Sequence, residues 1–518
     1  MRQGHRAGTT GSHSLGPGLH RLPRQIAPLS AASGGIAVRR SRNLIKRVGA
    51  SCRKVREPVW VGAVLALTVL TRLPTLSEPL VEMHGFRQTQ TAWSAVLFAR
   101  QGIDLLHPQV PVLGPPFALP LEFPLFQAMA APLLRLGLPV EPVLRGLDLF
   151  WFTVSALLIY LIGRRLAGRA TALIALVAFT FSPFAILWSR TALIEYLAVA
   201  AGLGVLYFTM LALDRRSWRW TAAAAIAGAI ALTVKDTTGA VWGAVTAVYV
   251  LSRLLNTDSR REIVGRALII GLPALAAAIV WMVASAAVRR ENLYAYTIND
   301  AGFGRWFFGT LAQRLDPSTW LVIASRIVEE LTGFAAVVWL YLAIREIRRQ
   351  TWSYRLPWLG LIGVIALAPL VLTNVYLVHD YYLAAISPAI ALVIGLGGAH
   401  LLAHWRAGWA IGLVLVAAWA MAFWSLGEYV TLPYALPADS GELRIARQVE
   451  AETSPDRMVA LITHDQYWDP SYFFYAHREG LLVVNQILPL GAIQAACSDP
   501  RYQVLELVDG TVRPYHCQ

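Results

Sequence analysis

Eleven stretches of the sequence are each long and apolar enough to cross the hydrocarbon core of a bilayer, which is about 30 Å thick. These stretches lie near residues 58–76, 144–163, 170–188, 192–213, 218–235, 238–254, 265–288, 327–345, 356–376, 381–402 and 407–427. Hydrophobic residue types make up 56% of the chain and charged types 15%, whereas soluble domains have about 45–50% and roughly 25%. This composition excludes a soluble globular protein and, for most of the chain, disorder. We predict an all-α polytopic membrane protein.

The net charge of +14 is concentrated in the first 56 residues, which contain twelve Lys or Arg and no Asp or Glu. We predict that residues 1–57 form a basic, disordered cytoplasmic leader that fixes membrane orientation, and we predict no nucleic-acid partner. No small-residue cleavage site follows the first apolar run, so the leader does not look like a secretory signal. It loosely resembles a mitochondrial transit peptide, but Gly16-Pro17-Gly18 would interrupt the amphipathic helix that import requires.

Arginine recurs in every even-numbered connection between the predicted spans. The connections contain Arg164, Arg215, Arg260, Arg348 and Arg406 respectively. Because cytoplasmic loops are enriched in Lys and Arg, the N-terminus is predicted inside and the C-terminus outside. The prediction is a multi-pass protein of the cell (inner or plasma) membrane. Its transmembrane domain would cover 58–427, with large outer loops at 77–143 and 289–326.

Two short helices are predicted in the first outer loop. Residues 88–101 have an amphipathic pattern, and residues 122–136 are apolar but too short and proline-interrupted to span. Helices of this kind lie at the membrane interface, so they would form a platform over the transmembrane bundle.

Residues 428–518 read as a small extracytoplasmic α/β domain. An amphipathic helix at 441–452 precedes strands at 457–463, 480–486 and 502–508, with helical connections near 470–477 and 489–497. Two cysteines of this segment, Cys497 and Cys517, either form a disulfide in an oxidising compartment or remain free thiols. Cys52 would lie on the cytoplasmic side.

Charged side chains gather at the outer ends of the predicted spans. They are Glu82, His84 and Arg87 in the first loop, Glu122 in the second platform helix, Arg190 and Glu195 between the third and fourth spans, and Lys235, His379, Asp380 and Tyr381 in two further turns. Each group alone could be a solvated loop, a helix-start acid, a surface ion pair or a snorkelling helix end. Together they lie on one membrane face, where Arg and Lys would meet a phosphate and carboxylates would support group transfer.

Four segments of the chain resemble the GT-C glycosyltransferases, in particular the protein O-mannosyltransferases and the lipid A aminoarabinose transferases. The segments read HGFRQTQTA, EFPLFQ, SRTALIEYLAV and HDYYLAAISPAI. They are especially similar to bacterial dolichyl-phosphate-mannose-type transferases. The resemblance covers roughly residues 58–400, and the C-terminal segment resembles tails of this group more loosely.

The resemblance assigns roles to individual residues. Glu82 matches a first-loop acid, usually Asp, that acts as general base or contacts a metal, and Arg87 matches an arginine near the donor phosphate. Glu122, Glu195 and His379 match further active-site positions. The catalytic residue is therefore predicted to be Glu82. The predicted substrate-binding residues are His84, Glu122, Glu195, His379, Asp380 and Tyr381.

This sequence departs from the family pattern at several of these positions. Glu stands in place of Asp at 82 and 195, and Phe123 replaces a lysine of the aminoarabinose branch. The donor phosphate would then be bound by Arg87 and Lys235, with Arg190 or Arg305 in support. Lipid A is accordingly not assigned as the acceptor.

The predicted activity is transfer of a sugar from a polyprenyl-phosphate donor to a hydroxyl of a glycan, lipid or protein on the outer face, with inversion as in the family. Carboxylates could hold Mg²⁺ or Mn²⁺, although the sequence defines no ligand set. The alternatives are a lipid or polysaccharide transporter and a non-catalytic scaffold. A transporter predicts inverted repeats and polar groups at the bilayer midplane, and the predicted spans show neither feature.

Overall fold

The structure is a computed structural model that describes residues 57–256, 259–299, 303–404, 408–427, 440–465 and 468–517. Residues 61–518 form one compact unit, and the interactions reported below lie within it. Apart from Glu57, the predicted basic leader lies outside the described residues.

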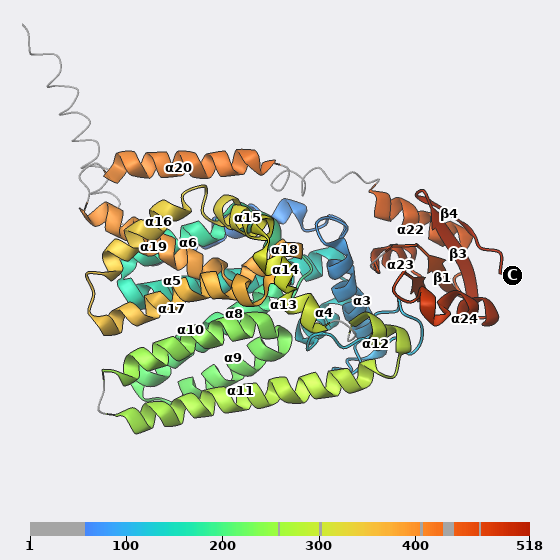
Figure 1. Cartoon of the computed structure of the whole chain (residues 1–518), viewed down its shortest axis with the longest axis horizontal. Helices are drawn as coiled ribbons and strands as arrows, with labels where there is room; N and C mark the ends of the chain where they lie inside the picture. The colour runs from blue at the N-terminus through green and yellow to red at the C-terminus, as the bar shows by residue number, and fades with distance from the viewer. Residues whose placement is uncertain are drawn as a thin grey trace, which may run out of the picture. The chain divides into compact units, whose positions relative to one another are not determined.

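Each of the eleven apolar stretches is helical over most of its described length (Figure 1). The corresponding helices are α2 (Glu57–Leu70), α5 (Val140–Ala167), α6 (Arg169–Thr180), α7 (Pro183–Trp188), α8 (Glu195–Arg215), α9 (Trp218–Val234), α10 (Asp236–Leu254), α11 (Arg260–Arg289), α16 (Ala336–Ile347), α17 (Trp352–Val371), α19 (Ser387–His404) and α20 (Gly408–Ser425). Helix α9 packs against α8, which precedes it in the sequence, and against α11.

Shorter helices occupy the connections. The two predicted platform helices are present as α3 (Gly85–Gln101) and α4 (Leu125–Arg135). Glu122 precedes α4 rather than lying in its first turn, because Pro124 is the N-cap. The remaining short helices are η1 (Leu73–Thr75), α12 (Leu293–Asn299), α13 (Phe303–Phe308), α14 (Leu311–Leu315), α15 (Pro317–Arg326), η2 (Ile327–Leu331), α18 (Thr373–Val378) and η3 (Asp380–Ala385).

Within the described ranges, six helices are long and apolar enough to cross a membrane. Five of them are α5, α8, α11, α17 and α19, and the sixth runs from Glu57 to Thr75 through α2 and η1. A seventh candidate joins Pro317–Leu331 to α16 across a 77° bend, and α6, α9 and α20 are apolar but shorter. The structure therefore confirms a mostly helical fold of membrane type, and it does not confirm the count of eleven.

The predicted spans at 170–188 and 356–376 are among those that are broken rather than continuous. In the stretch 170–188, α6 ends at Thr180 and α7 restarts at Pro183, where the Ser182 hydroxyl accepts a hydrogen bond of 3.1 Å from the Ala185 N–H. Proline suits the first turn of a helix because its missing N–H would have no partner there. The stretch 356–376 breaks at Leu372, shortly after Pro369 within α17.

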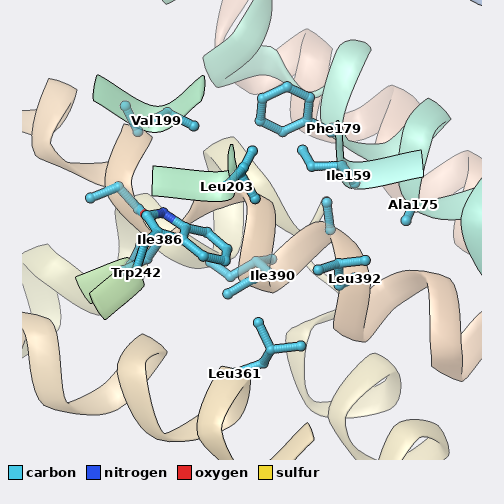
Figure 2. Packing of buried hydrophobic residues seen from close by; sticks show 14 of the residues in the cluster. Ile159, Ala175, Phe179, Val199, Leu203, Trp242, Leu361, Ile386, Ile390 and Leu392 are labelled. Carbon is cyan, nitrogen blue, oxygen red and sulfur yellow. The ribbon is translucent and has the colours of Figure 1, made fainter. Parts of the chain in front are cut away.

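The transmembrane core is a continuous set of aliphatic and aromatic side chains (Figure 2). Trp242 of α10 is fully buried and lies over Gly202 of α8, where an added Cβ would be 2.7 Å from the indole ring. The indole Nε1 donates a hydrogen bond of 3.1 Å to the carbonyl of Ala385. Glycine at 202 thus lets α8 and α10 approach, and the indole ties both helices to the segment that precedes α19.

The C-terminal segment contains a four-stranded sheet with strand order β2-β1-β3-β4. The three predicted strands are present as β1 (Met458–Ile462), β2 (Gly480–Val483) and β3 (Tyr502–Val508), with β1 parallel to both neighbours. The unpredicted strand β4 (Thr511–Pro514) forms an antiparallel hairpin with β3 through Asp509-Gly510, a turn pair typical of tight hairpins. Helices α22 (Gly441–Glu452), α23 (Ser471–Ala476), η4 (Leu488–Leu490) and α24 (Ala492–Ser498) surround the sheet.

The open edge of β2 is covered by residues 111–114, which belong to the connection between α2 and α5. The Gly114 N–H donates to the Gly480 carbonyl at 2.8 Å, and the Leu482 N–H donates to the Val112 carbonyl at 2.7 Å. Side chains of both segments also belong to one hydrophobic cluster. This pairing, which the sequence analysis did not predict, fixes the sheet against the loop that carries His84 and Arg87.

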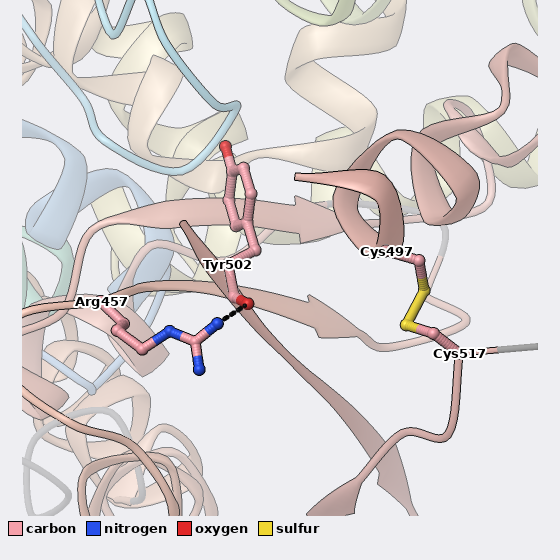
Figure 3. The surroundings of a disulfide bond; sticks show 4 residues. All are labelled: Arg457, Cys497, Tyr502 and Cys517. Carbon is pink, nitrogen blue, oxygen red and sulfur yellow. Dashed lines mark hydrogen bonds between the residues drawn. A yellow bond between two sulfur atoms is a disulfide. The ribbon is translucent and has the colours of Figure 1, made fainter. Parts of the chain in front are cut away.

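The C-terminal end is tied back to the sheet by a covalent bond. Cys497 of α24 and Cys517 form a disulfide, which decides between the two alternatives left by the sequence (Figure 3). Nearby, the Arg457 guanidinium donates a hydrogen bond of 2.8 Å to the carbonyl of Tyr502 at the start of β3.

Candidate functional site

A buried ion cluster joins the first outer loop to the transmembrane helices. The carboxylate of Glu82 accepts hydrogen bonds from Arg145 of α5 and, at 3.1 Å, from Arg190 in the turn before α8. The Glu82 and Arg145 side chains have no exposed surface. Arg145 also donates to the Arg190 carbonyl at 2.8 Å and to the Pro79 carbonyl at 2.9 Å. The cluster therefore fixes three segments of the chain to one another.

Arg145 was not among the predicted site residues, although it is completely buried near the start of α5. Asp148, one turn later in α5, is also fully buried and accepts hydrogen bonds of 3.2 Å from the Thr191 N–H and hydroxyl. Both residues face the turn before α8. The available signal was an Arg and an Asp three residues apart at the start of an apolar run, because buried charges in such runs are rare and usually paired.

A second group of ion pairs brings Arg87 and Lys235 together with their acids. Arg87, in the first turn of α3, pairs with Glu122 and donates a hydrogen bond of 2.9 Å to the amide oxygen of Gln90. Lys235, between α9 and α10, pairs with Glu195, the first residue of α8. Lys235 and Glu195 are almost completely buried, whereas the Glu122 side chain is 25% exposed. The second oxygen of Glu195 has no hydrogen-bond partner among the described residues.

Aromatic rings connect these two ion pairs. The Lys235 Nζ lies 4.9 Å from the ring centre of Tyr381 and 4.2 Å from that of Tyr382, within the range of cation–π attraction. His379 stacks on Tyr381 at a centroid distance of 5.0 Å and packs against Trp306 at 5.5 Å. Tyr382, Trp306 and also Trp188 were not in the predicted residue set, and their sequence positions beside charged turns gave only a weak signal.

His84 is held at the centre of this aromatic group. Its Nε2 lies 3.0 Å from Oδ1 of Asp380, and its ring centre lies 4.8 Å from that of His379. The backbone of His84 is in the left-handed region, with φ of 53°, which few residues other than glycine adopt. This conformation, immediately before α3, turns the chain so that Arg87 follows one helical turn later. The His84 Nδ1 has no hydrogen-bond partner among the described residues.

The structure thus brings together most of the predicted residues. His84, Arg87, Glu122, Glu195, Lys235, His379, Asp380 and Tyr381 form one group, and Glu82 with Arg190 forms the adjoining buried cluster. Arg305 of α13 is exposed and takes part in none of the ion pairs within the described part of the chain. The arrangement presents two cations, one histidine–carboxylate pair and several aromatic rings, a set suited to binding a phosphate beside a sugar.

The acids of this group do not form a ligand cage for a divalent cation. Glu122 and Glu195 each face a cationic side chain, so binding a metal there would require both ion pairs to open. In the described ranges, the one cluster with metal-ligand character consists of Glu346, His400 and His404, at the far end of α19 from Asp380. We therefore derive no step through a metal ion at the candidate site.

The imidazole of His379 provides a test of the burial of this group. Burial, with the nearby charges of His84, Arg87 and Lys235, lowers the pKa of His379 from 6.5 to about 3. The unfolded chain takes up a proton below pH 6.5 and the folded chain does not. Lowering the pH from 6.5 to 5 should therefore reduce the free energy of unfolding by about 2 kcal/mol through this group. We expect the thermal unfolding midpoint in detergent to decrease as the pH is lowered over this range. The decrease should be smaller in the His379→Phe variant.

The exposed His464, which pairs with Glu506, offers the matched control. His464→Phe should keep the pH dependence of the unmodified protein. Equal pH dependence in His379→Phe and the unmodified protein would contradict the burial of His379.

The chain is similar to a known protein family and to several solved structures. Residues 120–283, which include Glu122, Glu195 and Lys235, match the family model of dolichyl-phosphate-mannose-protein mannosyltransferases. No curated protein matches the sequence. ArnT from Cupriavidus metallidurans, solved bound to undecaprenyl phosphate, superimposes with a TM-score of 0.59 at 16% identity, covering 87% of this chain and 93% of ArnT.

Two further solved structures are similar. The oligosaccharyltransferase of Archaeoglobus fulgidus has a TM-score of 0.54 at 12% identity and covers 86% of this chain, which spans 65% of its length. The mycobacterial arabinofuranosyltransferase AftD has a TM-score of 0.50 at 18% identity over 83% of this chain and 32% of its own. At such identities the likeness concerns the fold. The expected resemblance is confirmed: this chain has the fold of the GT-C glycosyltransferases.

Proposed function

We propose that the protein is a membrane glycosyltransferase that transfers a sugar from a polyprenyl-phosphate donor to a hydroxyl group at the outer face of the membrane. The observation that carries the proposal is that Lys235 lies against the rings of Tyr381 and Tyr382 beside the His84–Asp380 pair, while Arg87 follows His84 by one helical turn. A leaving phosphate needs cations, a sugar ring packs on aromatic faces, and an attacking hydroxyl needs a proton acceptor. The GT-C fold and the mannosyltransferase match agree with this combination.

The donor lipid is inferred from the related structures. ArnT was solved with undecaprenyl phosphate, and the Archaeoglobus fulgidus oligosaccharyltransferase was solved with a dolichol-phosphate and an inhibitory peptide. We propose a donor of the same class for this chain. The acceptor is a glycan, lipid or protein bearing a free hydroxyl.

The two cations take the leaving phosphate in this proposal. The Arg87–Glu122 and Lys235–Glu195 ion pairs hold both cations in place before the donor arrives. A phosphate that enters between them competes with the two carboxylates, and the guanidinium of Arg87 can bind two phosphate oxygens at once. Arg190 has a secondary role because it already binds Glu82, and Arg305 is the outermost candidate cation.

The proton acceptor in this proposal is His84. The sequence pointed to Glu82, but the Glu82 carboxylate has no exposed surface and both of its oxygens bind arginine. We assign Glu82 to positioning, since it anchors the loop two residues before His84. The His84 side chain is 17% exposed, and its Nε2 faces the carboxylate of Asp380. This leaves Nδ1 for the acceptor hydroxyl and lets Asp380 stabilise the imidazolium that forms.

The transfer is a single step in which one bond forms and one bond breaks. The acceptor oxygen forms a bond to the anomeric carbon, while the bond from that carbon to the phosphate oxygen breaks. The electron pair of the broken bond stays on polyprenyl phosphate beside Arg87 and Lys235. The hydroxyl proton passes to Nδ1 of His84 and is later released to water. Attack opposite the leaving group inverts the anomeric centre.

The membrane arrangement is also part of the proposal. We propose eleven spans within residues 58–427, a cytoplasmic N-terminus preceded by the basic leader, and residues 428–518 as an extracytoplasmic domain of a cell-membrane protein. The arginines in the even-numbered connections support this orientation. A transporter is not favoured, because the buried charges of α5 are paired with loop residues.

The orientation can be tested with fusions to the full chain. A reporter that works only in the cytoplasm should be active when it is inserted after Arg169. A reporter that works only outside the cytoplasm should be active when it is fused after Gln518. The pair of reporters shows whether the number of crossings between the two positions is odd, as the eleven-span arrangement requires. A cytoplasmic signal after Gln518 would contradict the eleven-span arrangement and the outer location of the site.

The enzymatic proposal predicts different outcomes for matched histidine variants. Purified full-length protein would be incubated with undecaprenyl-phosphate-linked radioactive mannose and an envelope extract as acceptor. His84→Ala should reduce sugar transfer by about 10²–10⁴-fold, the usual contribution of a general base. His107→Ala removes the other His–Asp pair of the first loop, His107 with Asp104, and should leave transfer unchanged. Arg87→Ala should mainly raise the KM for the donor.

Two outcomes would count against these assignments. Normal transfer by His84→Ala, combined with loss of transfer in a stably folded Glu82→Gln protein, would return the base to Glu82. If no undecaprenyl- or dolichyl-phosphate-linked sugar were consumed by the unmodified protein, the glycosyltransferase proposal would itself be contradicted.

A further inference from the structure

A cavity lies between the platform helix α3 and the C-terminal segment that contains the sheet. It has a volume of about 320 Å³, and its walls come from α3, the start of α5, the residues around β1, and α23 with the residues after it. The wall residues that matter here are Trp93, Arg100, Phe474, His477 and Glu479. The volume is at the lower end of the range of about 300–1,000 Å³ found for ligand sites.

A buried aromatic side chain lines this cavity. Trp93 is 3% exposed, and its ring packs edge-to-face against Phe474 at 5.5 Å. The indole Nε1 donates to no acceptor within the described residues. Because this N–H has almost no accessible surface, Trp93 contributes its aromatic ring to the cavity wall rather than a hydrogen-bond donor.

Charged groups without ion pairs lie in the same wall. Burial raises the pKa of Glu479, and the charge of Arg100 on α3 partly opposes this shift. Although each side chain senses the other, neither belongs to an ion pair within 4.0 Å in the described ranges. His477, next to them in left-handed backbone, donates no side-chain hydrogen bond there either.

Two other arginines of this wall, unlike Arg100, donate hydrogen bonds to backbone carbonyls. Arg478 donates to the Thr453 carbonyl at 2.9 Å, and Arg457 donates to the Pro500 carbonyl at 2.7 Å. These two arginines hold the segment together. The charged groups of Arg100 and Glu479 remain available, and they line the same cavity.

We propose that this cavity binds a sugar unit of a glycan acceptor, at a site separate from the transfer site. A sugar offers hydroxyl groups that both donate and accept, together with apolar C–H faces. Arg100 supplies donors, Glu479 supplies an acceptor, and Trp93 with Phe474 supply aromatic surface. The wall contains both acids and arginines, so it suits a neutral polar ligand that donates and accepts hydrogen bonds, and an apolar lipid would leave these charged groups without partners.

The position of the cavity along α3 gives the acceptor a minimum length. Arg87 lies in the first turn of α3 and Arg100 near its end. Thirteen residues of α-helix advance by about 20 Å. An acceptor that reaches both sites must therefore contain several sugar residues. This inference rests on the proposed function and narrows its acceptor to an oligosaccharide or polysaccharide.

Binding can be measured without any transfer reaction. The full-length protein in detergent would be titrated with fluorescent neutral tetrasaccharides of mannan, glucan and galactan, with a sulfated tetrasaccharide and an acidic peptide as comparators. We expect at least one neutral tetrasaccharide to bind. Arg100→Ala and Glu479→Gln should each weaken it by about tenfold, and Trp93→Phe by about fivefold. Arg501→Ala, which alters an exposed arginine paired with Asp499, should have no effect.

The remaining outcomes separate this inference from the proposed function. No binding of a neutral tetrasaccharide, or binding unaffected by Arg100→Ala and Glu479→Gln, would contradict it. Binding of the sulfated sugar alone or of the peptide alone would also overturn it. Arg100 is exposed, so its variant should fold even if Trp93→Phe does not. Arg87→Ala should keep tetrasaccharide binding while transfer falls, so each proposal can fail without the other.

Discussion

The buried contact of Glu82 with Arg145 and Arg190 is the interaction on which the geometry of the site depends. Removing three charged groups from water costs free energy, and only close pairing and further hydrogen bonds offset that cost. The structure supplies both, because Arg145 also binds the Arg190 and Pro79 carbonyls. The contact joins the first outer loop, α5 and the turn before α8. It thereby sets the start of α3, where His84 and Arg87 lie.

The side chains of the site come from places where helices begin, end or break. Glu195 begins α8, Lys235 separates α9 from α10, and His379 separates α18 from η3. At such points a polar side chain can lie beside an apolar bundle without entering its middle, and the backbone can turn it toward a neighbour. The first outer loop supplies the remaining groups, and its pairing with the edge of β2 holds it in place. A rigid helical bundle thus carries a site composed mainly of connections.

The sequence could predict the helices and the membership of the site but not its internal pairing. Apolar runs located the helices because hydrocarbon thickness dictates their length, and the charges at one membrane face identified Arg87, Glu195 and Lys235. The partners of Glu82 could not be derived, since Arg145 lies 63 residues away and inside an apolar run. The breaks at Ser182 and Leu372, and the pairing of residues 111–114 with β2, likewise depend on tertiary contacts. Local pattern carries no information about such contacts, so the sequence could propose Glu82 as the base but could not show its burial between two arginines.

The central claim is that Arg87 and Lys235 together bind the phosphate of a polyprenyl donor. The most direct test is an experimental structure of the full-length protein with undecaprenyl phosphate. The account predicts phosphate oxygens within hydrogen-bonding distance of both cations, with the Glu122 and Glu195 carboxylates moved away from them. Phosphate bound elsewhere, for example at Arg305, with the Arg87–Glu122 and Lys235–Glu195 pairs intact, would contradict it.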